Sequence, residues 1–129
     1  MAITLSNAAA KAMCDALVDL VDGGTGAGFV AGYTSGDVEV FTCACSATAF
    51  GAATTASPSV ATAATISDDT SPTGGDLTSG YHAFEDSAST EIWRGSIGTS
   101  GADLNISSLT IATTDTVSIS SYTVSQPTS

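Results

Sequence analysis

The sequence predicts a mainly β protein, an antiparallel β-sandwich or a jelly-roll-like barrel, with one N-terminal α-helix over about residues 7–22. Short segments with alternating apolar and polar residues recur from residue 29 to residue 124, separated by turns rich in Gly, Ser and Asp. Before residue 23, in contrast, apolar residues recur at spacings of three and four. Aromatic residues make up only 6% of the 129 residues, so the core must be thin. The length is that of one domain, residues 1–129.

The predicted helix has a start signal, an apolar face and a stop signal. Ser6 or Asn7 can cap its first turn, because either side chain accepts a hydrogen bond from an otherwise unpaired amide. Gly23 and Gly24 end it. The apolar face consists of Ala9, Met13, Ala16, Leu17, Leu20 and Val21, and the charged remainder of Lys11, Asp15, Asp19 and Asp22. Three acids near the C-terminus oppose the helix dipole, and either a partner's basic residue or solvent exposure would accommodate them.

The strands are expected at 29–33, 38–45, 59–66, 80–85, 91–97, 104–106, 109–111 and 115–124. Between them, residues 67–79 have turn composition throughout and are predicted to form a long exposed loop. In the hairpin of residues 80–97, Trp93 and Ile97 share one face and are predicted core anchors.

The last expected strand, residues 115–124, has the strongest alternation in the chain. Val117 and Ile119 lie on one predicted face, whereas Tyr122 and Val124 lie on the other. Pro127 should end the pairing, because proline has no amide hydrogen to donate.

The charge balance excludes two classes of partner. The chain has 13 Asp and Glu residues against Lys11 and Arg94, which gives a formal charge of −11. Such a chain repels nucleic acid and anionic membrane surfaces, because both are bound through Lys and Arg. No uninterrupted apolar stretch approaches the length of a membrane span, and residues 1–5 lack the basic start of a signal peptide. We therefore expect a soluble protein made in a cytoplasm.

The possible metal ligands do not form a recognisable site. The three cysteines, at 14, 43 and 45, are an odd number, which favours reduced and buried thiols over a disulfide framework. Cys43 and Cys45 resemble half of a zinc site, but only Cys14 and His82 remain to complete it. Asp68, Asp69 and Asp76 lie in the predicted loop and are possible calcium ligands, although their spacing differs from that of a helix–loop–helix calcium site.

Catalytic motifs are also missing from the sequence. His82 is the one conventional general base, and no Gly-x-Ser-x-Gly nucleophile motif accompanies it. Glu85 and Glu91 could act as the two carboxylates of a glycosidase, but acids that flank a tight turn are usually solvated. The glycine-rich stretch 23–28 follows a helix and has no Gly-Lys-Ser or Gly-Lys-Thr, so it is predicted to be a turn. We expect no enzyme, and no catalytic, cofactor-binding or metal-binding residue.

Both ends of the chain resemble small structural proteins encoded among the virion genes of tailed bacteriophages. At the C-terminal end, the residues that carry the resemblance are Tyr81, Phe84, Asp86, Ile92, Trp93, Gly95, Ile97, the run Gly98 to Asn105 (GTSGADLN), Val117, Ile119 and Pro127. At the N-terminal end, an Asn-Ala-Ala run leads into a short acidic helix that ends in Asp-Gly-Gly. The two ends cover well over half of the chain, and the Ala- and Thr-rich middle departs from the family pattern.

The resemblance implies a virion protein made in the bacterial host, most plainly a head decoration or cement protein. Such a protein would bind the outside of the head and bridge neighbouring subunits of the major capsid protein. It would also associate with itself, and a trimer at three-fold positions suits a closed shell. A tail-tube, neck or other tail protein is the first alternative. A glycan-binding or calcium-dependent adhesion module that uses the loop from Asp68 to Asp76 is the second.

Overall fold

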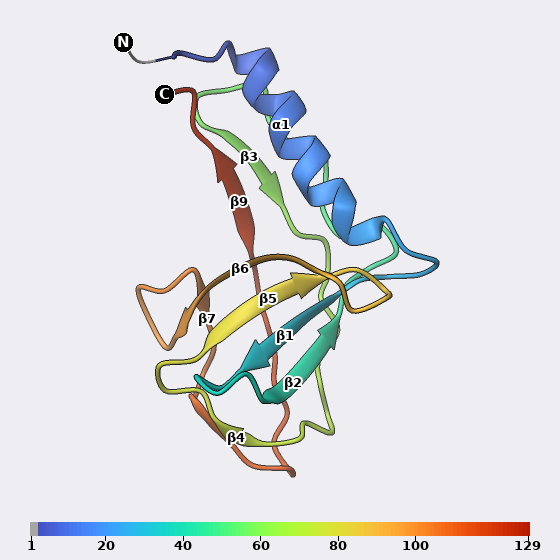
Figure 1. The fold of residues 1–129 in the computed structure, drawn as a ribbon, viewed down its shortest axis with the longest axis vertical. Helices are drawn as coiled ribbons and strands as arrows, with labels where there is room; N and C mark the ends of the chain where they lie inside the picture. The colour runs from blue at the N-terminus through green and yellow to red at the C-terminus, as the bar shows by residue number, and fades with distance from the viewer. Residues whose placement is uncertain (1–2) are drawn as a thin grey trace.

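The computed structural model describes residues 3–129 and confirms the predicted class, a mainly β fold with one N-terminal helix (Figure 1). The helix α1 (Asn7–Asp19) continues as one 3₁₀ turn (Leu20–Asp22). The strands are β1 (Phe29–Tyr33), β2 (Glu39–Ala44), β3 (Ser59–Thr62), β4 (Gly75–Asp76), β5 (Tyr81–Glu85), β6 (Glu91–Gly98), β7 (Leu104–Asn105), β8 (Thr110–Ile111) and β9 (Thr123–Gln126). Each strand expected before residue 112 coincides with an observed one, although several are shorter.

The elements form two regions that lie one above the other in Figure 1. The lower region, which we call the head, holds a five-stranded sheet in the order β2-β1-β5-β6-β7 and the small β4–β8 pair. Neighbouring strands of the large sheet are antiparallel except for β6 and β7, which are parallel. The upper region, which we call the arm, consists of α1 packed on the two-stranded β3–β9 ladder. Both ends of the described chain lie at the tip of the arm.

The helix begins where the sequence predicts, but it buries a different face. The Ser6 side chain caps it by accepting a hydrogen bond from the Ala9 amide. The buried stripe consists of Ala10, Cys14, Val18 and Val21, of which only Val21 belongs to the predicted apolar face. Met13 and Leu20, from the predicted apolar face, are about half exposed instead (49% and 53%). Two apolar stripes compete on this helix, and a ladder of only two strands covers one of them.

The predicted C-terminal strand is wrong in extent. The chain pairs in a ladder only from Thr123 to Gln126, and Val117 forms an isolated bridge with Asp69. Tyr122 is buried like Val117, although strict alternation places the two on opposite faces. The physical reason is that this segment crosses from the head to the arm and changes partners on the way (Figure 1). The prediction for Pro127 is confirmed, since β9 ends at the residue before it.

The predicted loop at residues 67–79 has more structure than expected. Its segment Gly75–Asp76 is β4, which pairs with β8, and Pro72 and Leu77 are buried. Gly74 and Gly75 have φ values of 85° and 148°, which glycine adopts without strain. The Gly74 amide donates to the Val40 carbonyl, so the segment covers the outer edge of β2. The composition of residues 67–79 correctly predicted turns in the backbone, but the prediction that the whole segment is exposed is wrong.

The core is aromatic in the head and made of small residues in the arm. Phe84 is fully buried, and its ring lies 4.6 Å from those of Trp93 and Tyr122, centroid to centroid. Ile97 is buried and Trp93 is partly buried against the core, so the predicted anchors are confirmed. The three cysteines are buried and unpaired, as predicted. Beneath α1, by contrast, the buried residues of β3 are Ser59 and Ala61.

Candidate interaction surface

The one histidine of the chain is a structural residue of the head. His82 is completely buried, and both ring nitrogens are hydrogen-bonded, Nδ1 with the Ser96 carbonyl at 2.9 Å and Nε2 with the Tyr122 hydroxyl at 2.8 Å. Because Nδ1 must donate to a carbonyl, Nε2 accepts from Tyr122, whose oxygen accepts from the Trp93 indole at 3.2 Å. Burial lowers the pKa of His82 and keeps it neutral. No substrate can reach this imidazole without opening the core.

The acids Glu85 and Glu91 face one another across the β5–β6 pair, but they have separate partners. Glu85 is buried and accepts a hydrogen bond from the Tyr33 hydroxyl, and burial raises the pKa of both groups. Glu91 forms an exposed ion pair with Arg94 at 2.9 Å. The guanidinium of Arg94 lies 4.1 Å from the centroid of the Tyr81 ring. The Tyr33–Glu85 hydrogen bond joins β1 to β5, and the Arg94–Tyr81 contact joins β6 to β5.

Two of the three acids of the 67–79 segment accept hydrogen bonds from the backbone, and the third, Asp68, is exposed. Asp69 accepts hydrogen bonds from the amides of Thr42 and Ser71, and Asp76 accepts one from the amide of Thr78. Among residues 3–129, no three side chains of His, Cys, Asp or Glu are grouped so that they could hold a metal ion. The described part of the chain likewise has no helix that is both long and apolar enough to cross a membrane.

The glycine-rich stretch 23–28 is a turn that closes the helix onto the sheet. The Gly26 amide donates to the Ser87 hydroxyl, and a side chain at Gly28 would collide with the Glu85 carbonyl and with Val21. Close packing therefore requires glycine at position 28, whereas a side chain at Gly26 would meet no neighbour.

The comparisons with known proteins give no family. No protein-family model, curated protein or solved structure matches the chain.

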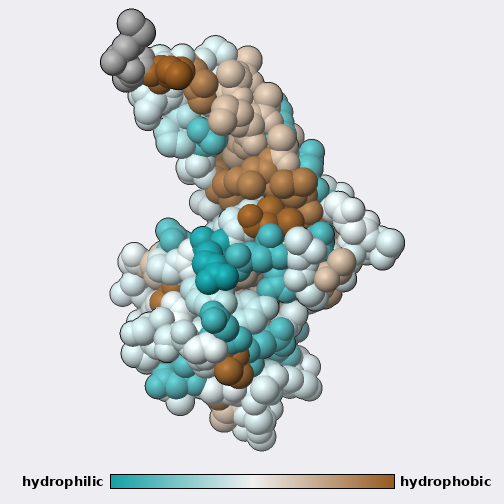
Figure 2. Space-filling model, in the orientation of Figure 1, coloured by the Kyte–Doolittle hydropathy of each residue, from teal (hydrophilic) through white to brown (hydrophobic). Residues whose placement is uncertain are grey.

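Apolar side chains form an exposed stripe on α1, and packing within the chain does not explain their exposure. We call Ala9, Met13, Ala16, Leu17 and Leu20 the helix stripe. All five lie on one side of α1, where Met13, Ala16 and Leu20 are exposed and the other two are partly buried. Figure 2 shows hydrophobic residues gathered over the end of α1 nearest the head, with hydrophilic residues on the sheet below. Large apolar side chains grouped in this way are typical of a protein-binding surface.

Two acids, one in α1 and one in the 3₁₀ turn that follows it, form hydrogen bonds with backbone amides of the same chain. Asp15 accepts a hydrogen bond from the Ala53 amide and pairs with Lys11, and Asp22 accepts from the Ala49 amide. Two of the three acids that oppose the helix dipole are thus accommodated inside the molecule, which neither expected explanation included.

The two strands of the arm, β3 and β9, lie in long uncharged stretches of the chain. Residues 46–67 and 116–129 contain no charged side chain, although the chain has fifteen. The first run includes β3, the second includes β9, and the two strands pair in the arm. We call these two runs the uncharged layer. Sequence reasoning had missed it, even though the two runs can be read directly from the sequence.

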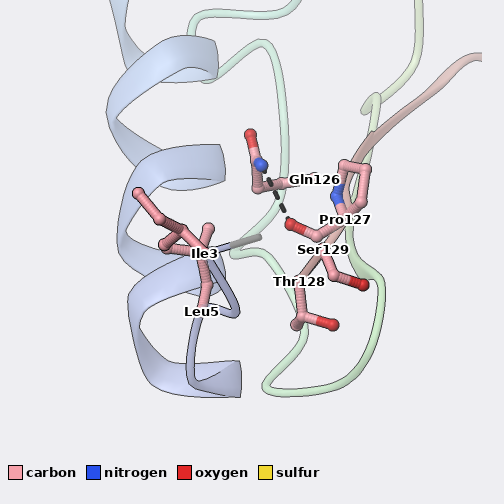
Figure 3. A pocket seen from close by; sticks show the side chains of 6 residues that line it. All are labelled: Ile3, Leu5, Gln126, Pro127, Thr128 and Ser129. Atoms are coloured by element: carbon pink, nitrogen blue, oxygen red, sulfur yellow. Dashed lines mark hydrogen bonds between the residues drawn. The ribbon is translucent and has the colours of Figure 1, made fainter. Parts of the chain in front are cut away.

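Two open hollows lie at the tip of the arm. One, of about 270 Å³, is lined by Ile3, Leu5, Gln126, Pro127, Thr128 and Ser129 (Figure 3). The second, of about 280 Å³, lies beside it and includes Ser57 and Pro58. Both hollows are lined by apolar and uncharged polar residues.

Proposed function

We propose that the chain is a structural protein of a bacteriophage virion, a decoration protein that binds the outside of the head and bridges subunits of the major capsid protein. The observation that carries this proposal is the helix stripe, an apolar surface without a partner on a chain that is otherwise strongly acidic. The opposite side of α1 is buried through Ala10, Cys14 and Val18, which holds the helix on the β3–β9 ladder. This is the arrangement of a rigid module that binds other proteins.

The proposed role is mechanical. Half-exposed Met13 and Leu20 would become buried against a capsid subunit, and each fully buried side chain of this size stabilises by roughly 1.5–3 kcal/mol. One such contact is weak, but a shell repeats it many times, and bivalent attachment multiplies the affinity. A non-catalytic role also agrees with the complete burial of His82.

The first experiment is to locate the chain. Its reading frame is expected among virion structural genes, and mass spectrometry of purified particles is expected to find it in heads, including heads that lack tails. Recovery only in tails would favour the tail alternative. A reading frame outside any phage or prophage would overturn the proposal.

The second experiment tests the helix stripe. The double substitution Met13→Ser and Leu20→Ser is expected to abolish co-sedimentation with expanded empty heads. Its free energy of unfolding should stay within about 0.5 kcal/mol of the parent protein, because both side chains are on the surface. Ala12→Ser, at another exposed position of α1, is the matched control and should bind normally. Undiminished binding of the double variant would show that the stripe does not contact the capsid.

A further inference from the structure

The strand β9 has one paired edge and one open edge. Its partner β3 is covered on the far side, because the Thr54 amide donates to the Val60 carbonyl and the Gly51 amide donates to the Thr62 carbonyl. In Figure 1, β9 lies on the outer side of the arm, with β3 between it and the side on which α1 lies. The arm therefore ends in a strand edge.

The open edge belongs to Thr123 and Ser125. These residues stand opposite Thr62 and Val60, whose backbone groups point away from β9. In an antiparallel ladder, when the backbone groups of one residue point away from the partner strand, those of the residue opposite do so too. The amides and carbonyls of Thr123 and Ser125 therefore point away from β3. Within residues 3–129 these four groups have no hydrogen-bond partner. Residues 3–5 cover the strand only farther along, where the Leu5 amide donates to the Thr128 carbonyl.

The uncharged layer bears on whether a second copy of the chain can pair with this edge. Two molecules that each carry a formal charge of −11 repel one another wherever their acids meet. Around β9 this repulsion is weak, because neither β9 nor β3 has a charged side chain. Small Thr and Ser side chains also lose little rotamer entropy when they are buried in a contact.

We propose that β9 pairs with β9 of a second copy of the chain, antiparallel and about a two-fold axis at Val124. Thr123 of one copy then stands opposite Ser125 of the other, and the two pairs exchange four backbone hydrogen bonds. The ladders join into one four-stranded sheet, with both α1 helices on the same face. This is a two-fold dimer, in contrast to the trimer that the phage resemblance implies, and it forms whether or not the chain binds a capsid.

The test is the mass of the purified protein by light scattering over a range of concentrations up to millimolar. The dimer is expected at about twice 12.6 kDa. The double substitution Thr123→Lys and Ser125→Lys should halve this mass, because it places like charges opposite one another at the axis. Thr62→Lys, an exposed position on β3, is the matched control and should remain dimeric. A parent protein that is monomeric at every concentration, or a lysine variant that still dimerises, would overturn the proposal.

A disulfide tests the register and does not depend on the lysine variant remaining folded. Hydrogen-bonded residue pairs in antiparallel strands have Cα atoms about 5.5 Å apart, within the range that a disulfide spans. The double variant Thr123→Cys and Ser125→Cys should therefore form a covalent dimer on oxidation. The single variants should not, because each new cysteine then faces a Ser or Thr. The native cysteines are buried and will not interfere. Absence of the covalent dimer in the double variant would rule out this register.

Discussion

The head and the arm use different means to hold their strands together. In the head, the rings of Phe84, Trp93 and Tyr122 pack within one cluster, and side-chain contacts such as that of Arg94 with the Tyr81 ring join neighbouring strands. In the arm, α1 packs on a two-stranded ladder through small residues such as Ala10 and Ala61. The arm leaves an apolar helix stripe and a strand edge without partners. Under our two proposals, the head is a framework and the arm is the part of the molecule that associates.

The largest expected effect compares the two cores directly. Phe84→Ala in the head should lower the free energy of unfolding by about 3–5 kcal/mol, because it leaves a large cavity in the aromatic cluster. Val18→Ala in the arm should lower it by only about 2 kcal/mol, since it removes two buried methyl-sized groups. Urea unfolding of both variants gives the comparison. An equal or larger loss for Val18→Ala would contradict the idea that the head carries most of the stability.

The next effect concerns the junction between the regions. Tyr122→Phe removes the hydroxyl that joins His82 to Trp93 and leaves two buried groups unpaired, at a cost of about 1–3 kcal/mol. Tyr81→Phe is the control, because its hydroxyl donates to Asp37 at an exposed site and should cost less than about 0.5 kcal/mol. Thermal melting distinguishes them, and equal losses would show that the buried network does not stabilise the junction.

The same histidine predicts a pH dependence. Burial lowers the pKa of His82 below 6.5, so the unfolded chain binds a proton there before the folded one does. Stability from this group is complete above pH 6.5 and is lost as the pH falls below it, with a slope of at most about 1.4 kcal/mol per pH unit. Glu85 acts in the opposite sense at lower pH, because burial raises its pKa above 4.5. The measurement is therefore the difference between the parent protein and His82→Gln. Parallel pH profiles would contradict the predicted titration.

The smallest effect is local to the arm. Ser6→Ala removes the cap of α1 and should cost about 1 kcal/mol, because the Ala9 amide loses its acceptor. Asn at the same position should restore most of the loss, which circular dichroism during thermal unfolding would show. A fully stable Ser6→Ala protein would indicate that packing on β3 and β9 alone fixes the start of the helix.

Features that depend on neighbouring residues could be predicted from the sequence. Local hydrogen bonding and alternation predicted a cap at Ser6 or Asn7, the end of β9 before Pro127 and every strand up to residue 111 except β4. The buried face of α1 could not be predicted, because two apolar stripes are available and the width of the β3–β9 ladder selects one. The break near Tyr122 also depends on the tertiary structure, since it marks the passage from one region to the other.

Part of the candidate surface could be predicted from the sequence. The two uncharged runs, 46–67 and 116–129, are visible in the sequence, but that they lie together depends on the pairing of β3 with β9. Met13 and Leu20 were predicted on the apolar face of the helix, and their exposure is the observation on which the proposed binding surface depends.

Hydrogen exchange at low and high protein concentration tests most directly whether the arm, and not the head, associates. We predict that raising the concentration slows exchange of the amides in Thr123–Gln126, because those of Thr123 and Ser125 gain partners, while β1 and β5 exchange at the same rate. Slower exchange in β1 or β5, or no change in β9, would contradict the assignment of association to the arm.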